Sequence, residues 1–264
     1  MTRGRFGLGS PSLLDVRDVF VRFGGVVALD DLSFSVDENQ ICGLIGPNGA
    51  GKTTLFNVVS RIYEPTTGHV LLDGNDLLDV DAHEIANLGV ARTFQNLALF
   101  PRLTVLENVM VGAHSRCKVN FASAPFRIGV GREEKRLTQE AMNILGYLGL
   151  ANIALRPAAG LPFGTLKRIE LARAMAAKPR LLLLDEPASG LAHAEVDELG
   201  QTIRGLRDQF GLTVLLVEHH MQLVMGISDK VVVLDFGRKI AEGAPAHIQN
   251  DQSVIEAYLG SSVR

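Results

Sequence analysis

A glycine-rich segment that ends in a lysine and a threonine carries the clearest chemical signal in this sequence. Four residues separate Gly46 from Gly51, and Lys52 and Thr53 follow directly, which is the spacing of a phosphate-binding loop. Because glycine lets the backbone approach closely, the N–H groups and the dipole of a following helix can face phosphate oxygens. The alternative is a glycine-rich turn that binds no ligand.

If the segment binds a nucleotide, its two polar side chains have separate roles. Lys52 would reach the β- and γ-phosphates, and the Thr53 hydroxyl would be a ligand of Mg²⁺. The predicted nucleotide-binding residues of the segment are Gly46, Pro47, Asn48, Gly49, Ala50, Gly51, Lys52, Thr53 and Thr54.

Two carboxylates follow an apolar run much later in the chain. Asp185 and Glu186 come directly after Leu181–Leu184. At the carboxyl end of a strand, Asp185 would hold Mg²⁺ through water, and Glu186 would orient and deprotonate an attacking water. Two acids after a strand are also common turn residues. Together with the phosphate-binding loop, they predict hydrolysis of a nucleotide.

Short apolar runs predict the elements that position these residues. Ile41–Ile45 precedes the phosphate-binding loop, and a helical apolar stripe runs over Thr53–Ser60. Continuous runs of this kind are typical of parallel strands covered by helices on both faces. The further runs are Val70–Asp73, Leu181–Leu184, Val214–Val217 and Val231–Leu234.

Two other regions have different patterns. Leu13 to Val36 alternates apolar and polar residues around Phe23, Gly24 and Gly25, which predicts antiparallel strands joined by a turn. Residues 97–165 are predicted to form a helical insert. Its expected helices are Thr104 to Val111, Glu133 to Leu148 and one that starts at Thr165, with 112–131 as a loop or interaction surface.

We therefore predict an α/β fold with a phosphate-binding core, an antiparallel β-subdomain and an inserted helical subdomain. The expected single domain covers residues 13–260, with core segments 13–95 and 166–260, a helical subdomain at about 97–165 and an N-terminal tail at 1–12.

Composition excludes several classes of protein. The 264 residues are 47% hydrophobic and 21% charged with a net charge of −3, which disfavours disorder and gives no basic footprint for nucleic acid. Cys42 and Cys117 are far apart, so neither a disulfide framework nor a zinc site is indicated, and Cys42 is expected to be an inert core residue. No run approaches the roughly 20 apolar residues of a membrane span.

Several ordered motifs resemble those of ATP-binding cassette (ABC) ATPases, over about residues 13–259. They are Phe94–Gln95, Leu161 to Thr165, Ser189 to Leu191 and His219. The resemblance implies that Gln95 links the metal site to the helical insert and that His219 is the switch histidine. It also implies that Gly164 and Thr165 belong to the nucleotide-contacting signature and that Phe23 stacks on adenine. Core packing is the alternative for Phe23.

The chain departs from the family pattern at several positions. Pro162, Phe163 and Thr165 replace usual signature residues, and Ala192 stands where an acidic or amide residue is expected. We therefore expect weak ATP-dependent pairing of isolated subunits. His220 replaces the usual aspartate after the switch histidine. Strand alternation predicts that His219 and His220 cannot both face the nucleotide, and we expect His219 to face it.

A narrower resemblance is to the ATPase subunits of branched-chain amino-acid importers. Five segments carry it: Phe23 to Leu29, Arg92 to Leu97, Leu103 to Asn108, Glu218 to Asp229 and Glu256 to Gly260.

This resemblance implies a subunit that hydrolyses Mg-ATP at the cytoplasmic face of the cell membrane. Its implied partners are a second ATPase subunit, identical or paralogous and paired head to tail, two membrane subunits and, indirectly, an external solute-binding protein. Nucleic acid is not an expected partner. The implied catalytic residues are Glu186, His219, Gln95 and Lys52, and the implied metal-site residues are Thr53, Gln95 and Asp185.

Three alternatives stay open at this point. One is a soluble cassette ATPase that acts on nucleic acid or ribosomes, and another is a small-molecule kinase with a phosphate-binding loop. The third is an importer ATPase for urea, amides or other solutes. For an importer subunit, we expect at least one of Leu97, Leu99 and Phe100 to be exposed as a contact for the membrane partner.

Overall fold

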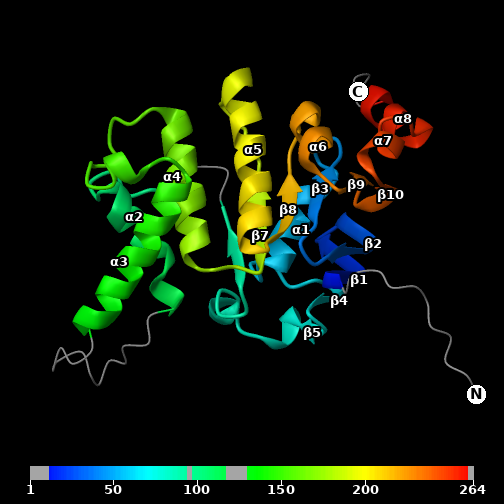
Figure 1. Ribbon diagram of the computed structural model, residues 1–264. Coiled ribbons are helices and arrows are strands. Elements are labelled where there is room, and N and C mark those ends of the chain that lie inside the picture. Colours follow the sequence, from blue (N-terminus) through cyan, green and yellow to red (C-terminus); the bar gives the residue numbers. More distant parts are fainter. Residues whose placement is uncertain (1–11, 94–96, 117–129, 261–264) are drawn as a thin grey trace, which may run out of the picture.

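A six-stranded sheet forms the core of the computed structural model, which describes residues 12–93, 97–116 and 130–260 (Figure 1). Its strand order is β10-β9-β3-β8-β7-β6, and all neighbouring pairs are parallel except β10 with β9. The strands are β3 (Ile41–Ile45), β6 (Val90–Arg92), β7 (Leu181–Asp185), β8 (Thr213–Val217), β9 (Lys230–Asp235) and β10 (Arg238–Gly243).

Burial on both faces explains the continuous apolar runs of this sheet. Every residue of β3, β7 and β8 is buried. On β7, Leu181 and Leu183 join one hydrophobic cluster, whereas Leu182 and Leu184 join the other. The parallel strands predicted from the runs at 41–45, 181–184, 214–217 and 231–234 are therefore confirmed.

The second sheet is antiparallel and has the order β2-β1-β4-β5. Its strands are β1 (Ser12–Phe23), β2 (Val26–Asp37), β4 (Thr67–Leu72) and β5 (Asn75–Asp76). The hairpin predicted around Gly24 is confirmed, and Gly24 has φ 57°. The prediction that Val70–Asp73 is a parallel strand is wrong, because Val70 pairs antiparallel with Val16. Three apolar residues in a row are too few to distinguish the two kinds of strand.

Helix α1 (Lys52–Val59) packs between the two sheets. Its buried residues Leu55 and Phe56 share a cluster with residues of both sheets. Four more helices belong to the C-terminal half: α5 (His193–Phe210), α6 (Met221–Ile227), α7 (Pro245–Ile248) and α8 (Gln252–Gly260). The short 3₁₀ helices are Leu77–Asp79, Ala82–Glu84, His114–Arg116 and Ala151–Ile153. No helix of the described residues is both long enough and apolar enough to span a membrane.

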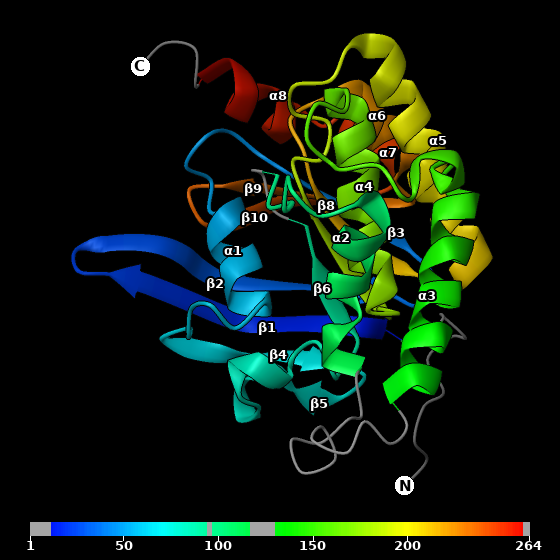
Figure 2. The same cartoon turned by 90° about the vertical axis from the view of Figure 1, so that its left-hand side faces the viewer.

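The predicted helical insert contains α2 (Val105–Gly112) and α3 (Val130–Tyr147), and α4 (Phe163–Ala176) begins at its end. The three helices lie side by side in Figure 2. Thr104 caps α2, and its hydroxyl accepts the N–H of Glu107. The helix expected from Thr165 begins two residues earlier, at Phe163. Pro162 is the extended residue just before the helix, with φ −56° and ψ 148°, and the fixed φ of proline suits this conformation.

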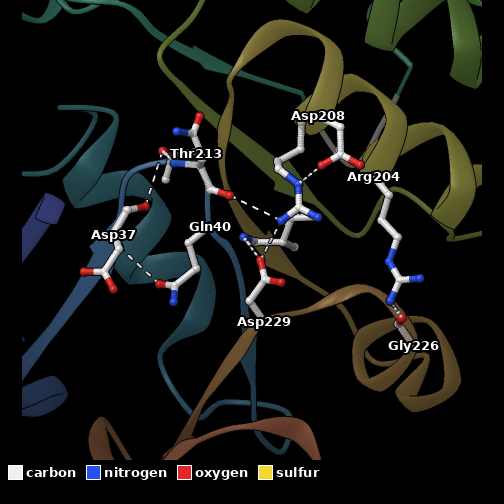
Figure 3. A network of polar contacts seen from close by, with 10 residues as sticks. Asp37, Gln40, Arg204, Asp208, Thr213, Gly226 and Asp229 are labelled. Carbon is white, nitrogen blue, oxygen red and sulfur yellow. Dashed lines mark hydrogen bonds and ion pairs between the residues drawn. The ribbon is translucent and has the colours of Figure 1, made fainter. Parts of the chain in front are cut away.

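A network of polar contacts closes the end of the core sheet where β3, β8 and β9 begin (Figure 3). Asp229 accepts the N–H of Ile41 at 2.8 Å and a hydrogen bond from Arg207 of α5 at 2.8 Å. The N–H of Asn39 donates to the Thr213 hydroxyl at 2.9 Å. These contacts fix α5 to the strand starts and leave the opposite, carboxyl ends of the strands for the candidate site.

Candidate functional site

The phosphate-binding loop connects β3 to α1, as predicted. Gly46, Gly49 and Gly51 have φ values of 152°, 82° and 101°, where residues with a side chain are strained. A Cβ on Gly46 would lie 2.1 Å from the carbonyl oxygen of Leu234, and one on Gly51 would lie 2.6 Å from that of Ala28. The loop can therefore pass between β2 and β9 only with glycine at these positions.

Lys52 is buried at the start of α1, and its side chain turns back over the loop. Its Nζ donates to the carbonyl oxygens of Gly46 at 2.7 Å and of Pro47 at 2.9 Å. Burial lowers the pKa of Lys52, and the nearby charge of Glu186 opposes this shift. The loop thus holds a partly desolvated cation against its own backbone, where an anionic group would be attracted strongly.

Asp185 ends β7 as a buried carboxylate that is paired with an arginine. Its Oδ2 accepts a hydrogen bond from Arg92 of β6 at 2.7 Å. The same guanidinium donates to Asn57 Oδ1 of α1 and to Oγ of Ser60, which follows α1, both at 2.8 Å. Sequence reasoning missed this role of Arg92. The signal that could have found it is a charged residue in a short strand beside a strand that ends in a carboxylate.

Glu186 stands just beyond the strand with φ 45°, a rare conformation for a residue that is not glycine. Such a conformation costs about 1–3 kcal/mol and persists only where neighbouring contacts fix it. Here the N–H of Glu186 donates to Val217 at 2.9 Å, and its carbonyl accepts the N–H of Ser189 at 3.1 Å. The Glu186 side chain is partly exposed.

The two histidines lie closer together than expected. His219 Nδ1 is 3.8 Å from Glu186 Oε2, so the structure brings the predicted switch histidine to the predicted base. The ring centroids of His219 and His220 are 4.9 Å apart, so the two side chains do not point to opposite sides as strand alternation predicts. That only His219 faces the nucleotide stays a prediction. Strand β8 already ends at Val217, so alternation does not extend to these residues.

The oxygen groups at the site suit Mg²⁺ better than a metal that needs an all-protein cage. Among the residues that the structure describes, no group of three or more His, Cys, Asp or Glu side chains could hold a metal ion. Mg²⁺ typically takes one or two protein oxygens and completes its shell with water and substrate phosphates. The hydroxyl of Thr53 and the carboxylate of Asp185 supply that kind of donor.

Phe23 and the pair Gly164 and Thr165 are predicted site residues from other parts of the chain. Phe23 is 48% exposed, so its core-packing alternative is wrong, and its ring meets Tyr63 edge to face at 5.1 Å. Gly164 and Thr165 lie in the first turn of α4, where a Cβ on Gly164 would be 2.4 Å from the Glu195 carboxylate. Gln95 lies outside the described residues.

The structure also places Cys42 and the apolar residues Leu99 and Phe100. Cys42 is fully buried and burial raises its pKa to about 12, which confirms that it is an inert core residue. Phe100 is 50% exposed, whereas Leu99 packs against the core, so the predicted exposed apolar residue after position 96 is Phe100.

Comparisons with known proteins agree with this geometry. The chain matches the family model described as ABC transporter over residues 29–189, and the one described as branched-chain amino acid ATP-binding cassette transporter over residues 238–264. It is 42% identical to the high-affinity branched-chain amino acid transport ATP-binding protein BraF of Pseudomonas aeruginosa, with 96% of this chain and 100% of BraF covered. Its identity to LivG of Escherichia coli is 41%, with the same coverage.

A solved structure supports the same conclusion. The ADP conformation of MJ1267, an ATP-binding cassette of an ABC transporter, matches with a TM-score of 0.84 and 30% identity, and covers 95% of this chain and 100% of that one. Since these similarities extend over nearly the whole length of the chain and of its relatives, the protein belongs to the ABC transporter family and is one of its nucleotide-binding ATPases.

Proposed function

We propose that this ATPase drives the import of branched-chain amino acids. The observation that carries the proposal is the likeness to BraF and LivG over 96% of the chain, including the C-terminal segment matched by the branched-chain family model. A small-molecule kinase is no longer an alternative, because the chain is an ABC ATPase. A soluble cassette that acts on nucleic acid has no support in these relatives, which are named as transport proteins.

In the proposed reaction, the phosphate-binding loop holds the nucleotide and the strand ends act on its terminal phosphate. Backbone N–H groups of the loop and the Lys52 ammonium bind the phosphate oxygens. Glu186 accepts a proton from the attacking water, and His219, 3.8 Å from Glu186, contacts the phosphate that is released. Thr53 and Asp185 would hold Mg²⁺, which supplies positive charge beside the phosphates when bound.

The remaining nucleotide contacts and the partners are proposed from the likeness to ABC importer ATPases. Phe23 is proposed to stack on adenine, Gln95 to join the metal site to the helical insert, and Gly164 and Thr165 to face the nucleotide of a second cassette. A paired cassette at the cytoplasmic face of the membrane would pass the energy of hydrolysis to two membrane subunits, which receive solute from an external binding protein.

A single substitution tests the proposed base. Glu186→Gln should retain ATP binding but lower turnover by ~10²-fold or more, because the amide accepts no proton from water. Steady-state phosphate release and titration with a fluorescent ATP analogue measure the two effects separately. Near-normal turnover of this variant would assign the base to another residue.

Uptake measurements test the cargo. Deletion of the gene for this chain should abolish high-affinity uptake of radiolabelled leucine, isoleucine and valine, and the wild-type gene but not the Glu186→Gln form should restore it. Urea and acetamide serve as control solutes. Loss of urea or acetamide uptake with leucine uptake intact would favour the alternative importer class.

A further inference from the structure

A carboxylate that takes no part in the proposed reaction is buried between the two loops that carry Glu186 and His219. Glu218 follows β8 directly and is only 1% exposed. Its Oε1 accepts the N–H of Ala188 at 2.7 Å. Its Oε2 accepts the N–H groups of His219 at 2.9 Å and of His220 at 3.1 Å.

The chemistry of these three contacts requires a carboxylate. Burying a charge is costly unless strong hydrogen bonds compensate for the lost water, and bonds from N–H groups to a carboxylate are about twice as strong as neutral ones. All the partners of Glu218 named above are donors, and they lie on both of its oxygens. A glutamine would present an acceptor on one side only and an NH₂ donor on the other.

The positions of the donors show what Glu218 holds together. Ala188 lies two residues after Glu186, in the turn that begins where the carbonyl of Glu186 accepts the N–H of Ser189 at 3.1 Å. On the other side, His219 Nδ1 lies 3.8 Å from Glu218 Oε2 and also 3.8 Å from Glu186 Oε2. The imidazole therefore lies beside two carboxylates, and one of them fixes the backbone of both loops.

We propose that Glu218 is a positioning residue for ATP hydrolysis, which sets the distance between the proposed base Glu186 and the proposed switch histidine His219. The proposal rests on the roles assigned to those two residues. Glu218 does not contact the substrate in this role. It acts by holding two backbone segments in register, and catalytic geometry of this kind loses rate when it loosens by about 1 Å.

Two variants of Glu218 separate the parts of this role. Glu218→Gln keeps the size of the side chain, but its NH₂ group cannot accept the hydrogen bonds that one of the two carboxylate oxygens accepts. Glu218→Asp keeps the charge and can still reach the adjacent N–H groups of His219 and His220, but it is one methylene too short for Ala188. Each variant should lower kcat by ~10-fold or more and leave the KM for ATP and the Kd of a fluorescent ATP analogue within about 2-fold of wild type.

Asp229→Asn is the matched control, because it also replaces a carboxylate that accepts a backbone N–H. Asp229 bonds to Ile41 and Arg207 at the opposite end of the sheet (Figure 3). This control should lower the thermal midpoint of unfolding but keep kcat within about 2-fold of wild type. If Glu218→Gln and Asp229→Asn lose stability and kcat alike, Glu218 is only structural and the proposal fails.

A double-mutant cycle with His219→Ala gives the decisive measurement in the full-length chain. If Glu218 acts through the His219 loop, Glu218→Gln should cost less than about 3-fold in kcat once His219 is absent. An undiminished effect in the double variant, or a kcat within 2-fold of wild type in the single one, would overturn the proposal. The Glu186→Gln variant is measured in the same assay. If the kcat of Glu186→Gln is normal, the proposed catalytic site is wrong. If the kcat of Glu186→Gln is low but that of Glu218→Gln is normal, only the positioning role of Glu218 is refuted.

Discussion

Lys52 carries its charge in a buried position beside the loop that is proposed to bind phosphate. Its burial lowers its pKa, and the ammonium is bonded to Gly46 and Pro47 of its own loop. Only the protonated form attracts phosphate, and a lowered pKa brings deprotonation to a less alkaline pH. Nucleotide affinity should therefore fall as pH rises, and the fall should begin below the pH at which a lysine side chain usually loses its proton.

The affinity for a fluorescent ATP analogue, measured between pH 7 and 10, tests this prediction. Lys52→Ala should bind at least ~10-fold more weakly than wild type at pH 7, because the cation is missing, and the two affinities should approach each other as pH rises. Lys52→Arg stays charged and is the control, whose affinity should not show the alkaline decline. Equal affinity of wild type and Lys52→Ala at pH 7 would remove Lys52 from the phosphate site.

The buried thiol of Cys42 should affect how stability depends on pH. Burial raises its pKa from 9.0 to about 12 in the folded protein. Between these values the unfolded chain releases a proton that the folded chain keeps, so the free energy of unfolding should decrease as pH rises above about 9. Urea unfolding at pH 7 and pH 10 should show a smaller alkaline loss for Cys42→Ala than for wild type. The same loss in both proteins would contradict the assignment.

At the scale of elements, α2 and α4 approach each other at a glycine. A Cβ on Gly112 would lie 1.9 Å from the carbonyl oxygen of Arg173, so a side chain there must push the two helices apart. We expect Gly112→Ala to destabilise the protein by ~1–3 kcal/mol, although alanine is the better helix former. Denaturant unfolding measures the change.

Gly146 provides the control for this helix contact. It lies in α3, and a Cβ at this position would be more than 4 Å from the other elements that the structure describes. Gly146→Ala should therefore leave stability unchanged or raise it by up to ~1 kcal/mol. If both substitutions change the free energy of unfolding equally, helix propensity and not the close approach of α2 and α4 explains the result.

At the scale of the whole molecule, the edge of the helical insert presents an apolar side chain on a fixed backbone. Phe100 is 50% exposed, and its N–H and carbonyl are both bonded to the buried amide of Asn108, at 2.8 and 3.0 Å. Exposure of one apolar side chain does not by itself identify an interface, so the expectation rests on the proposed function. For an importer subunit, we expect Phe100 to contact the proposed membrane subunits.

Phe100→Asp should abolish co-purification with the membrane subunits and solute uptake, while it leaves the basal ATPase rate within about 2-fold of wild type. Phe236, which is 75% exposed in the turn between β9 and β10, supplies the control Phe236→Asp. That variant should assemble and transport normally. Normal assembly of Phe100→Asp would show that the coupling contact lies elsewhere.

Most of the core strands and the local motifs of the candidate site could be predicted from the sequence. Continuous apolar runs specified β3, β7, β8 and β9, because strands buried on both faces need no polar residues. Fixed spacing specified the phosphate-binding loop from Gly46 to Thr53 and the carboxylates Asp185 and Glu186, because both features are local in the chain. The predicted start of α4 at Thr165 is two residues late, since the structure shows that the helix begins at Phe163, directly after Pro162.

Contacts between residues that are distant in the sequence could be seen only in the folded structure. Arg92 pairs with Asp185 across 93 positions of sequence, and Glu218 joins Ala188 across 30. No local pattern encodes such pairs, because they depend on the order of strands in the sheet and on where each strand ends. The same reason explains why β4 joined the antiparallel sheet and why the rings of His219 and His220 lie together beyond the end of β8.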